Sequence, residues 1–578
     1  MEQYYTDERN VQILIALLKE HGVKRVVASP GSTNVTFVGS IQQDPYFEIY
    51  SCVDERSAAY MACGMAAETG EPVALSCTGA TASRNYFPAL TEAFYRKLPI
   101  LAITSTQEEA RIGHLIPQAI DRNEQPRDTV KMSVHLQSVK DEWDEWDVMI
   151  KANKAILELN HHGMGPVHIN LTTRYSKKFT VKELLPVRKI ERFCLQNPLP
   201  EMPNCKIAVF VGSHLRWSQK LTEVVDKFCA THDAVVFCDP TANYTGKYRV
   251  NHELVCCQSK SMEMSCVDLL IHIGNMSDMF GMLRPKNVWR VSEDGNLVDS
   301  YKSLKKVFEM PEERFFEHYI GVTEVKNDFL DFCKKSYGEI YNDMPELPYS
   351  HIWVASQLFD KLPENSTMHL GILSPLRSWS YFNFSPTIEL YCNQGGFGID
   401  GNMSSMIGAS IVNPKRLFFA VVGDLSFFYD MNSLGNRHIG QNVRILLVNN
   451  ALGAEFHLFK QRNSIYVNGI DKYLSAGGHF GQKSPNLVRH YATDLGFEYL
   501  SASSKEEFLN VYKRFVTPEI TDKPMVFELF TNVEDENKAL YDLWHIREDK
   551  SLKTKVKNGV KSVIGEELTQ QIKNVIKR

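Results

Sequence analysis

The chain has 578 residues, of which 43% are hydrophobic, so it is long enough to form several separate cores. Its formal net charge of −5 excludes the strongly basic surface that nucleic-acid binding requires. The first residues lack the pattern of a signal peptide, and no apolar run approaches the ~18–20 residues that a membrane-spanning helix needs. We therefore expect a cytoplasmic protein that acts on small molecules and has no transmembrane segment.

The cysteine pattern supports the same compartment. Twelve cysteines are scattered along the chain, with one adjacent pair, Cys256 and Cys257, and no Cys-x-x-Cys motif. In a chain of this length such a distribution is typical of reduced thiols packed in protein cores.

Helical and strand patterns alternate in the first third of the chain. Apolar residues recur at helical spacing from Val11 to Leu18 and precede a strand predicted at residues 23–28. Four further segments have the strand pattern and are separated by enough chain for crossover helices: 47–52, 72–76, 99–104 and 166–171. This alternation predicts a parallel α/β sheet.

Two proline-marked stretches, 185–203 and 344–348, divide the rest of the chain. The strands predicted after them lie at residues 207–212, 234–238, 268–274, 417–423, 443–448 and 525–529. We predict three parallel-sheet α/β domains and a tail, with these limits: 1–182, 183–343, 344–545 and, for the tail, 546–578.

Polar residues follow two successive strands of the third domain. Asp424 comes after Gly423 at the end of one strand, and Asn450 comes after Asn449 at the end of the next. Each pair alone is a common turn. Because parallel strands end at one edge of a sheet, however, the two together favour a site for Mg²⁺ and a diphosphate group.

This pattern, with matching segments of the first domain, resembles the thiamine diphosphate-dependent enzyme superfamily. Within it the chain is most similar to the 2-succinyl-5-enolpyruvyl-6-hydroxy-3-cyclohexene-1-carboxylate synthases of the menaquinone pathway, which join 2-oxoglutarate to isochorismate. The segments that carry the resemblance are 29–32, 54–56, 72–78, 85–90, 118–121, 398–401, 423–426 and 430–434.

The resemblance implies roles for individual residues. Glu55 would hydrogen-bond N1′ of the cofactor's aminopyrimidine, and Ile399 would support the folded cofactor, although a core isoleucine explains Ile399 equally well. The other cofactor-binding residues implied are Thr78, Gly423, Asp424, Leu425, Ser426 and Asn450. The implied metal is Mg²⁺, with Mn²⁺ or Ca²⁺ as alternatives, bound by Asp424, Asn450 and the backbone carbonyl of Leu452. Gln118 and Arg377 would join Glu55 as catalytic residues.

The substrate residues of the synthase family are partly replaced. Thr33, Gln107 and Gln394 stand where the family has arginines that bind substrate carboxylates. Each lost charged hydrogen bond is worth ~1.5–3 kcal/mol, so three losses would greatly weaken binding of polyanions. We expect a less acidic acceptor unless Arg84 or Arg111 compensates; Ser32 is a further substrate candidate.

These features favour an enzyme that decarboxylates a 2-oxo acid and transfers the acyl carbanion to an acceptor. The alternatives are a simple 2-oxo acid decarboxylase, the menaquinone-pathway synthase itself, and a non-catalytic relative. The resemblance also implies a homodimer or homotetramer, because in this family the cofactor bridges domains of two subunits.

The C-terminal tail carries an apolar stripe. Apolar residues recur every three or four positions from Leu552 to Ile576, and lysines occupy the other faces. The pattern favours a helix that packs on the protein's own surface; a partner protein or an anionic membrane is the alternative. Gly559 and Gly565 weaken such a helix by roughly 1 kcal/mol each.

Overall fold

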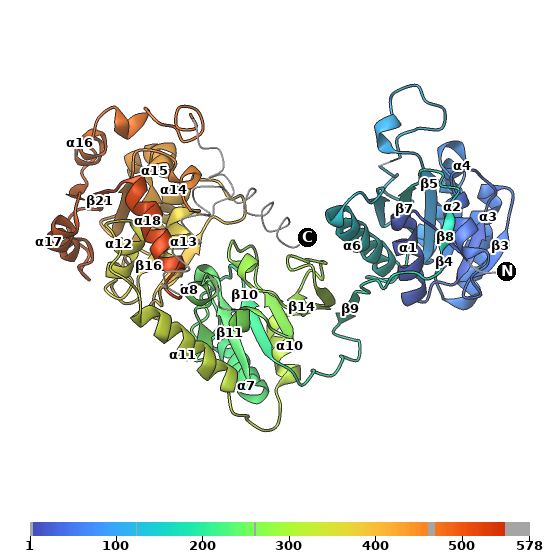
Figure 1. Ribbon diagram of the computed structural model, residues 1–578, viewed down its shortest axis with the longest axis horizontal. Coiled ribbons are helices and arrows are strands. Elements are labelled where there is room, and N and C mark those ends of the chain that lie inside the picture. The colour runs from blue at the N-terminus through green and yellow to red at the C-terminus, as the bar shows by residue number, and fades with distance from the viewer. Residues whose placement is uncertain (1–3, 123, 259–261, 460–468, 549–578) are drawn as a thin grey trace, which may run out of the picture. The chain divides into compact units, whose positions relative to one another are not determined.

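The computed structural model describes residues 4–122, 124–258, 262–459 and 469–548. These form two compact units (Figure 1), here called the first and the second unit. The first unit comprises Met1–Leu199 and Glu293–Glu309, and the second comprises Pro200–Ser292 and Met310–Arg578. The four domain limits predicted from the sequence stay a prediction.

The first unit contains a six-stranded parallel sheet. Its strand order is β3-β2-β4-β5-β7-β6. The strands are β2 (Arg25–Ala28), β3 (Glu48–Ser51), β4 (Val73–Thr78), β5 (Ile100–Thr106), β6 (Met132–Leu136) and β7 (Val167–Thr172). Five of them confirm predicted strands. The sixth, β6, was not predicted, because its residues are mostly half-buried and its apolar residues alternate with Ser133 and His135 rather than forming a continuous apolar run.

Helices cover both faces of this sheet. They are α1 (Arg9–Glu20), α2 (Val35–Ile41), α3 (Glu55–Thr69), α4 (Ala80–Arg84), α5 (Phe87–Arg96) and α6 (Glu142–Glu158). Successive strand residues point to opposite faces, so Val26 packs in the core formed with α1 and α6, whereas Val27 packs in the core formed with α3 and α5. Because the strands are parallel, their carboxyl ends lie at one edge of the sheet.

The remaining strands of the first unit form short pairs. Strand β1 (Tyr5–Thr6) runs antiparallel to β8 (Phe179–Val181). Strand β9 (Glu191–Cys194) runs parallel to β15 (Leu304–Glu309), and this pairing attaches residues 293–309 to the unit.

The second unit contains two groups of parallel strands. The first group is ordered β12-β11-β10-β13-β14, and the second β17-β16-β18-β19-β21-β20. The first group comprises β10 (Ile207–Val211), β11 (Ala234–Cys238), β12 (Arg249–Val250), β13 (Leu269–Ile273) and β14 (Asn287–Ser292). The second comprises β16 (Thr367–Leu370), β17 (Glu389–Cys392), β18 (Phe418–Gly423), β19 (Val443–Asn449), β20 (Glu498–Ala502) and β21 (Met525–Phe530). The six strands predicted here are confirmed, and so is the parallel α/β class.

Twelve further helices surround these strands in the described residues. They are α7 (Gln219–His232), α8 (Glu253–Cys256), α9 (Met262–Ser265), α10 (Glu312–Tyr319), α11 (Asp328–Asn342), α12 (His351–Leu358), α13 (Ser374–Ser380), α14 (Asn402–Val412), α15 (Asp424–Asp430), α16 (Leu487–Asp494), α17 (Lys505–Phe515) and α18 (Val533–Trp544). In the described part of the chain, no helix has the length and apolarity to cross a membrane. All twelve cysteines are described, and all are free thiols. Residues 549–578, which hold almost all of the predicted tail, lie outside the described residues.

A buried acid joins two helices of the second unit and makes stability depend on pH. The Glu536 carboxylate in α18 accepts hydrogen bonds at 3.0 Å from the backbone N–H of His351, at the start of α12. Burial raises the pKa of Glu536 from its ordinary value of 4.5 to about 7. The folded protein therefore keeps this proton at pH values where the unfolded chain has lost it, and stability falls as pH rises from 4.5 to 7.

We expect Glu536→Gln to stabilise the protein at pH 8, by up to about 3 kcal/mol, because the amide mimics the protonated acid. At pH 5 the gain should largely vanish. Thermal unfolding at both pH values checks this, with Glu534→Gln, an exposed position of the same helix, as control. An equal effect at the two pH values would contradict the buried-acid explanation.

Candidate active site

The two predicted metal ligands lie at adjacent strand ends in the second unit. Gly423 of β18 is paired in register with Val448 of β19, so Asp424 and Asn450 follow neighbouring strands. Both residues, together with Leu452, line one cavity of about 840 Å³. The sequence pattern had placed them at this edge, and the structure brings them together there.

Asp424 is buried without a cationic partner among the described residues. Its carboxylate accepts a hydrogen bond of 2.8 Å from the backbone N–H of Leu425. Burial nevertheless raises the pKa of Asp424 to about 7. A carboxylate, an amide oxygen and a backbone carbonyl are hard oxygen ligands, so this donor set fits Mg²⁺.

A small polar network joins Ser426, Ile399 and Asn402 near this edge. The Ser426 hydroxyl donates to the backbone carbonyl of Ile399 at 2.5 Å, and Asn402 donates to both, at 2.9 and 3.0 Å. Ile399 lines the same cavity, as do Gly423 and Leu425. The Ile399 side chain is half-buried on the wall of this cavity.

Glu55 lies at the corresponding edge of the first unit. It is the first residue of α3, whose N-cap, Asp54, accepts a hydrogen bond from the backbone of Ser57. The half-buried Glu55 carboxylate accepts a hydrogen bond of 3.1 Å from the Asn85 side chain. Asn85 thus orients Glu55, a contact that the sequence alone did not reveal.

Thr78 ends β4 at the same edge, and the turn after β2 packs against it. A Cβ atom on Gly31 would lie 1.9 Å from the Thr78 methyl carbon, so only glycine fits there. Ser32 in this turn is exposed. Thr33, in contrast, is buried, and its hydroxyl donates to the backbone carbonyl of Ser105 at 3.0 Å.

Gln394 is also committed to an internal network in the second unit. Its buried amide donates to Asp239 at 3.1 Å and to Thr241 at 3.0 Å, and it accepts from the backbone N–H of Asp278 at 2.9 Å. All of its amide groups are therefore in use. Arg377 lies nearby in an ion pair with Asp278 at 3.0 Å and another with Glu455 at 2.9 Å.

Comparison with known proteins shows the family of the chain. The N-terminal binding domain of thiamine pyrophosphate enzymes matches residues 9–125. The 2-succinyl-5-enolpyruvyl-6-hydroxy-3-cyclohexene-1-carboxylate synthase of Bacteroides thetaiotaomicron is 33% identical over 570 residues, covering 94% of this chain and 99% of that protein. The synthase of Phocaeicola vulgatus is 32% identical over 565 residues with the same coverage, and that of Flavobacterium psychrophilum is 28% identical over 550 residues, covering 90% and 95%.

The chain belongs to this family of thiamine diphosphate-dependent enzymes. It is therefore an enzyme of decarboxylation and carbon–carbon bond formation, as the sequence predicted. The similarity spans the middle of the chain as well, where none of the segments that carried the resemblance lies.

The segment between β5 and β6 contains three residues that were predicted to bind substrate or to act in catalysis: Gln107, Arg111 and Gln118. Arg111 donates to the Gln107 side chain at 2.5 Å, so the two residues form one polar pair. Gln118 is exposed and has a left-handed backbone, with φ of 67°. Arg84, proposed above as a compensating cation, donates to the backbone carbonyl of Asp121 at 3.0 Å.

Arg122, in the same segment, was not recognised from the sequence. Its guanidinium is buried and hydrogen-bonds the side chain of Asn170, and burial lowers its pKa to about 10. Its Nη1 atom has no partner among the described residues, and a Cβ on Gly79 would lie 3.4 Å from it. A buried cation with an unused N–H, next to the edge that carries Thr78, is suited to bind a carboxylate.

Proposed function

We propose that the protein uses thiamine diphosphate and Mg²⁺ to decarboxylate a 2-oxo acid and to transfer the acyl carbanion to an acceptor less acidic than isochorismate. The observation that carries the choice of acceptor is the internal use of Thr33 and Gln394. The resemblance implies that both stand where the synthase family has arginines. Both are buried and hydrogen-bonded within the protein.

Each end of the cofactor has its own set of residues in this proposal. Bound thiamine diphosphate supplies the electron sink for decarboxylation. Asp424, Asn450 and the Leu452 carbonyl would hold the metal and the diphosphate, and Ile399 would support the cofactor. Glu55, oriented by Asn85, would accept a hydrogen bond from the aminopyrimidine and favour its reactive tautomer.

The substrate can be tested directly with a panel of 2-oxo acids. Carbon dioxide release is measured with each acid alone and with aldehyde, ketone or enone acceptors, and 2-oxoglutarate with isochorismate serves as the reference pair. We expect turnover that depends on an acceptor and is faster than with the reference pair. Release without an acceptor would instead indicate a simple decarboxylase, and preference for the reference pair would indicate the menaquinone-pathway synthase.

We also propose that the active enzyme is a homodimer or homotetramer. Apolar side chains are exposed around both edges: Val53, Tyr60 and Met61 near Glu55, and Tyr429, Tyr473, Leu474 and Phe480 around the 840 Å³ cavity. Exposed apolar surface beside a site is typical of a surface covered by another subunit.

We therefore expect light scattering to give at least twice the chain mass of 66.0 kDa, at concentrations where the enzyme is active. An active monomer at nanomolar concentration would contradict this proposal.

A further inference from the structure

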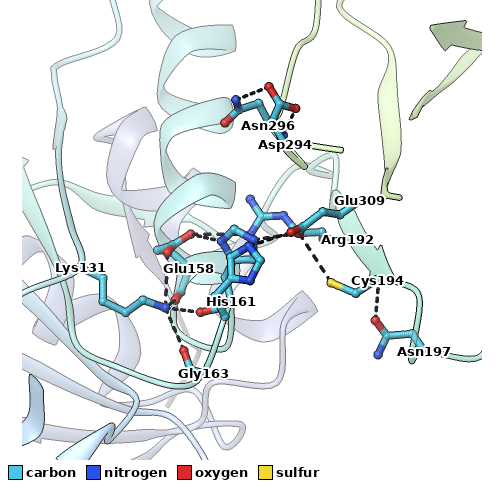
Figure 2. A network of polar contacts seen from close by, with 11 residues as sticks. Lys131, Glu158, His161, Gly163, Arg192, Cys194, Asn197, Asp294, Asn296 and Glu309 are labelled. Carbon is cyan, nitrogen blue, oxygen red and sulfur yellow. Dashed lines mark hydrogen bonds and ion pairs between the residues drawn. The ribbon is translucent and has the colours of Figure 1, made fainter. Parts of the chain in front are cut away.

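Two adjacent histidines and a glutamate meet in the first unit, away from the residues discussed above. His161 and His162 follow the C-terminal end of α6, and Glu309 is the last residue of β15. Figure 2 shows the His161 ring directed at the Glu309 carboxylate, with Glu158 on its other side. We call His161, His162 and Glu309 the histidine–glutamate cluster.

The two imidazoles converge on one carboxylate. His161 Nε2 lies 2.8 Å from Glu309 Oε2, and His162 Nε2 lies 2.7 Å from Oε1. One ligand atom from each of the three residues lies within 4.8 Å of the others. Two imidazole nitrogens and a carboxylate gathered in this way form a ligand set suited to a divalent transition metal.

A second carboxylate, that of Glu158, orients the His161 ring through the ring nitrogen that does not face Glu309. Its Nδ1 atom lies 2.8 Å from Glu158 Oε2, and Glu158 is in turn paired with Lys131 at 3.4 Å and Arg192 at 3.6 Å. A carboxylate on the far nitrogen is the usual outer partner of a metal-binding histidine, because it fixes the ring and its protonation. Lys131 and Arg192 balance the charge of Glu158, so this carboxylate stays an outer partner.

The strand pairing places a thiol beside Glu309. Cys194 is the in-register partner of Glu309 in the β9–β15 pair, and its Sγ atom lies 3.6 Å from Glu309 Oε2 (Figure 2). The Cys194 backbone N–H is fixed by the Asn197 side chain at 2.7 Å. Gly295 packs closely on Glu309, since a Cβ there would lie 2.6 Å from Oε2, which leaves the carboxylate little freedom.

We propose that the histidine–glutamate cluster binds one zinc ion, with the Cys194 thiolate as fourth ligand. The ion would clamp residues 293–309 to the C-terminal end of α6, and so would be structural. It is distinct from the Mg²⁺ assigned above, because that site offers oxygen ligands alone whereas this one offers nitrogen and sulfur.

Elemental analysis of the untagged full-length protein tests the proposal. After growth in zinc-supplemented medium and dialysis against buffer without chelator, we expect about one zinc per chain by mass spectrometry. His162→Ala is the key variant, since the His162 side chain is 70% exposed and its removal costs little packing. Zinc should fall to less than about one tenth per chain in this variant, with unchanged circular dichroism. His490→Ala, an exposed histidine of α16, is the matched control and should keep its zinc.

Zinc-free wild type, or a His162→Ala variant that keeps full zinc, would overturn the proposal and leave the cluster as an ion-pair network. Cobalt substitution tests the fourth ligand. A thiolate-to-cobalt absorption band in the wild type that disappears in Cys194→Ser supports it, and its absence from the cobalt-loaded wild type removes Cys194 from the ligand set.

Discussion

Glu55→Gln should abolish turnover while leaving cofactor binding nearly unchanged. The Glu55 carboxylate lies at the N-terminus of α3 and is oriented by Asn85. It is not among the residues assigned to the diphosphate and the metal. Glutamine keeps the shape and can still contact a ring nitrogen, but it cannot stabilise the tautomer through a charged acceptor. Losing a positioned proton-transfer group typically costs ~10²–10⁴-fold in rate.

Two measurements separate chemistry from binding in this variant. Calorimetric titration with thiamine diphosphate and Mg²⁺ should give a Kd within a few-fold of the wild type, and carbon dioxide release should fall by at least about 100-fold. Glu92→Gln, a half-exposed position on α5 of the same unit, is the control and should retain full rate. Near-normal activity of Glu55→Gln would remove Glu55 from the mechanism.

Much of the fold could be predicted because the strands are short, apolar and buried. In parallel sheets covered on both faces, strands such as β10, β11 and β18 are continuous apolar runs, and such runs can be recognised in the sequence. Strand β6 was not predicted, because it is half-buried and carries His135 and Ser133 between its apolar residues. Asp424 and Asn450 were predictable for a related reason: the end of an apolar strand is visible in a sequence, and parallel strands share one edge.

The partners of the polar side chains could not be predicted. Thr33 bonds to a carbonyl 72 positions away, and Gln394 bonds to Asp239, 155 positions away. From the sequence both were substrate candidates. A sequence does not distinguish a polar side chain that faces a substrate from one that is hydrogen-bonded in the protein interior. Arg122 was missed for the converse reason: burial of its guanidinium depends on Asn170, which a motif search does not connect with it.

Asp424→Ala should abolish Mg²⁺-dependent retention of thiamine diphosphate. Asp424 is the one carboxylate among the three assigned ligands, so its removal takes away the negative charge that balances the cation. Loss of an outer-shell partner already costs 10–100-fold in metal affinity, and we expect the loss of this direct ligand to exceed about 100-fold. Asn450→Ala should show a smaller loss, because a neutral amide oxygen attracts a divalent cation less than a carboxylate does.

Retention is measured by equilibrium dialysis of thiamine diphosphate at fixed protein concentration, with Mg²⁺ and with a chelator. In the wild type the chelator should release the cofactor, whereas in Asp424→Ala the two conditions should give equally weak binding. Asp494→Ala, an exposed aspartate at the end of α16, controls for the loss of one negative charge. If Asp424→Ala retained the cofactor as tightly as the wild type in Mg²⁺, another residue would have to hold the metal.

Because Asp424 is buried with a raised pKa, its alanine variant relieves an internal charge, and we expect its melting temperature without cofactor to be no lower than that of the wild type. Weak cofactor binding with an undiminished melting temperature would assign the defect to the lost ligand, since a misfolded site would lower both.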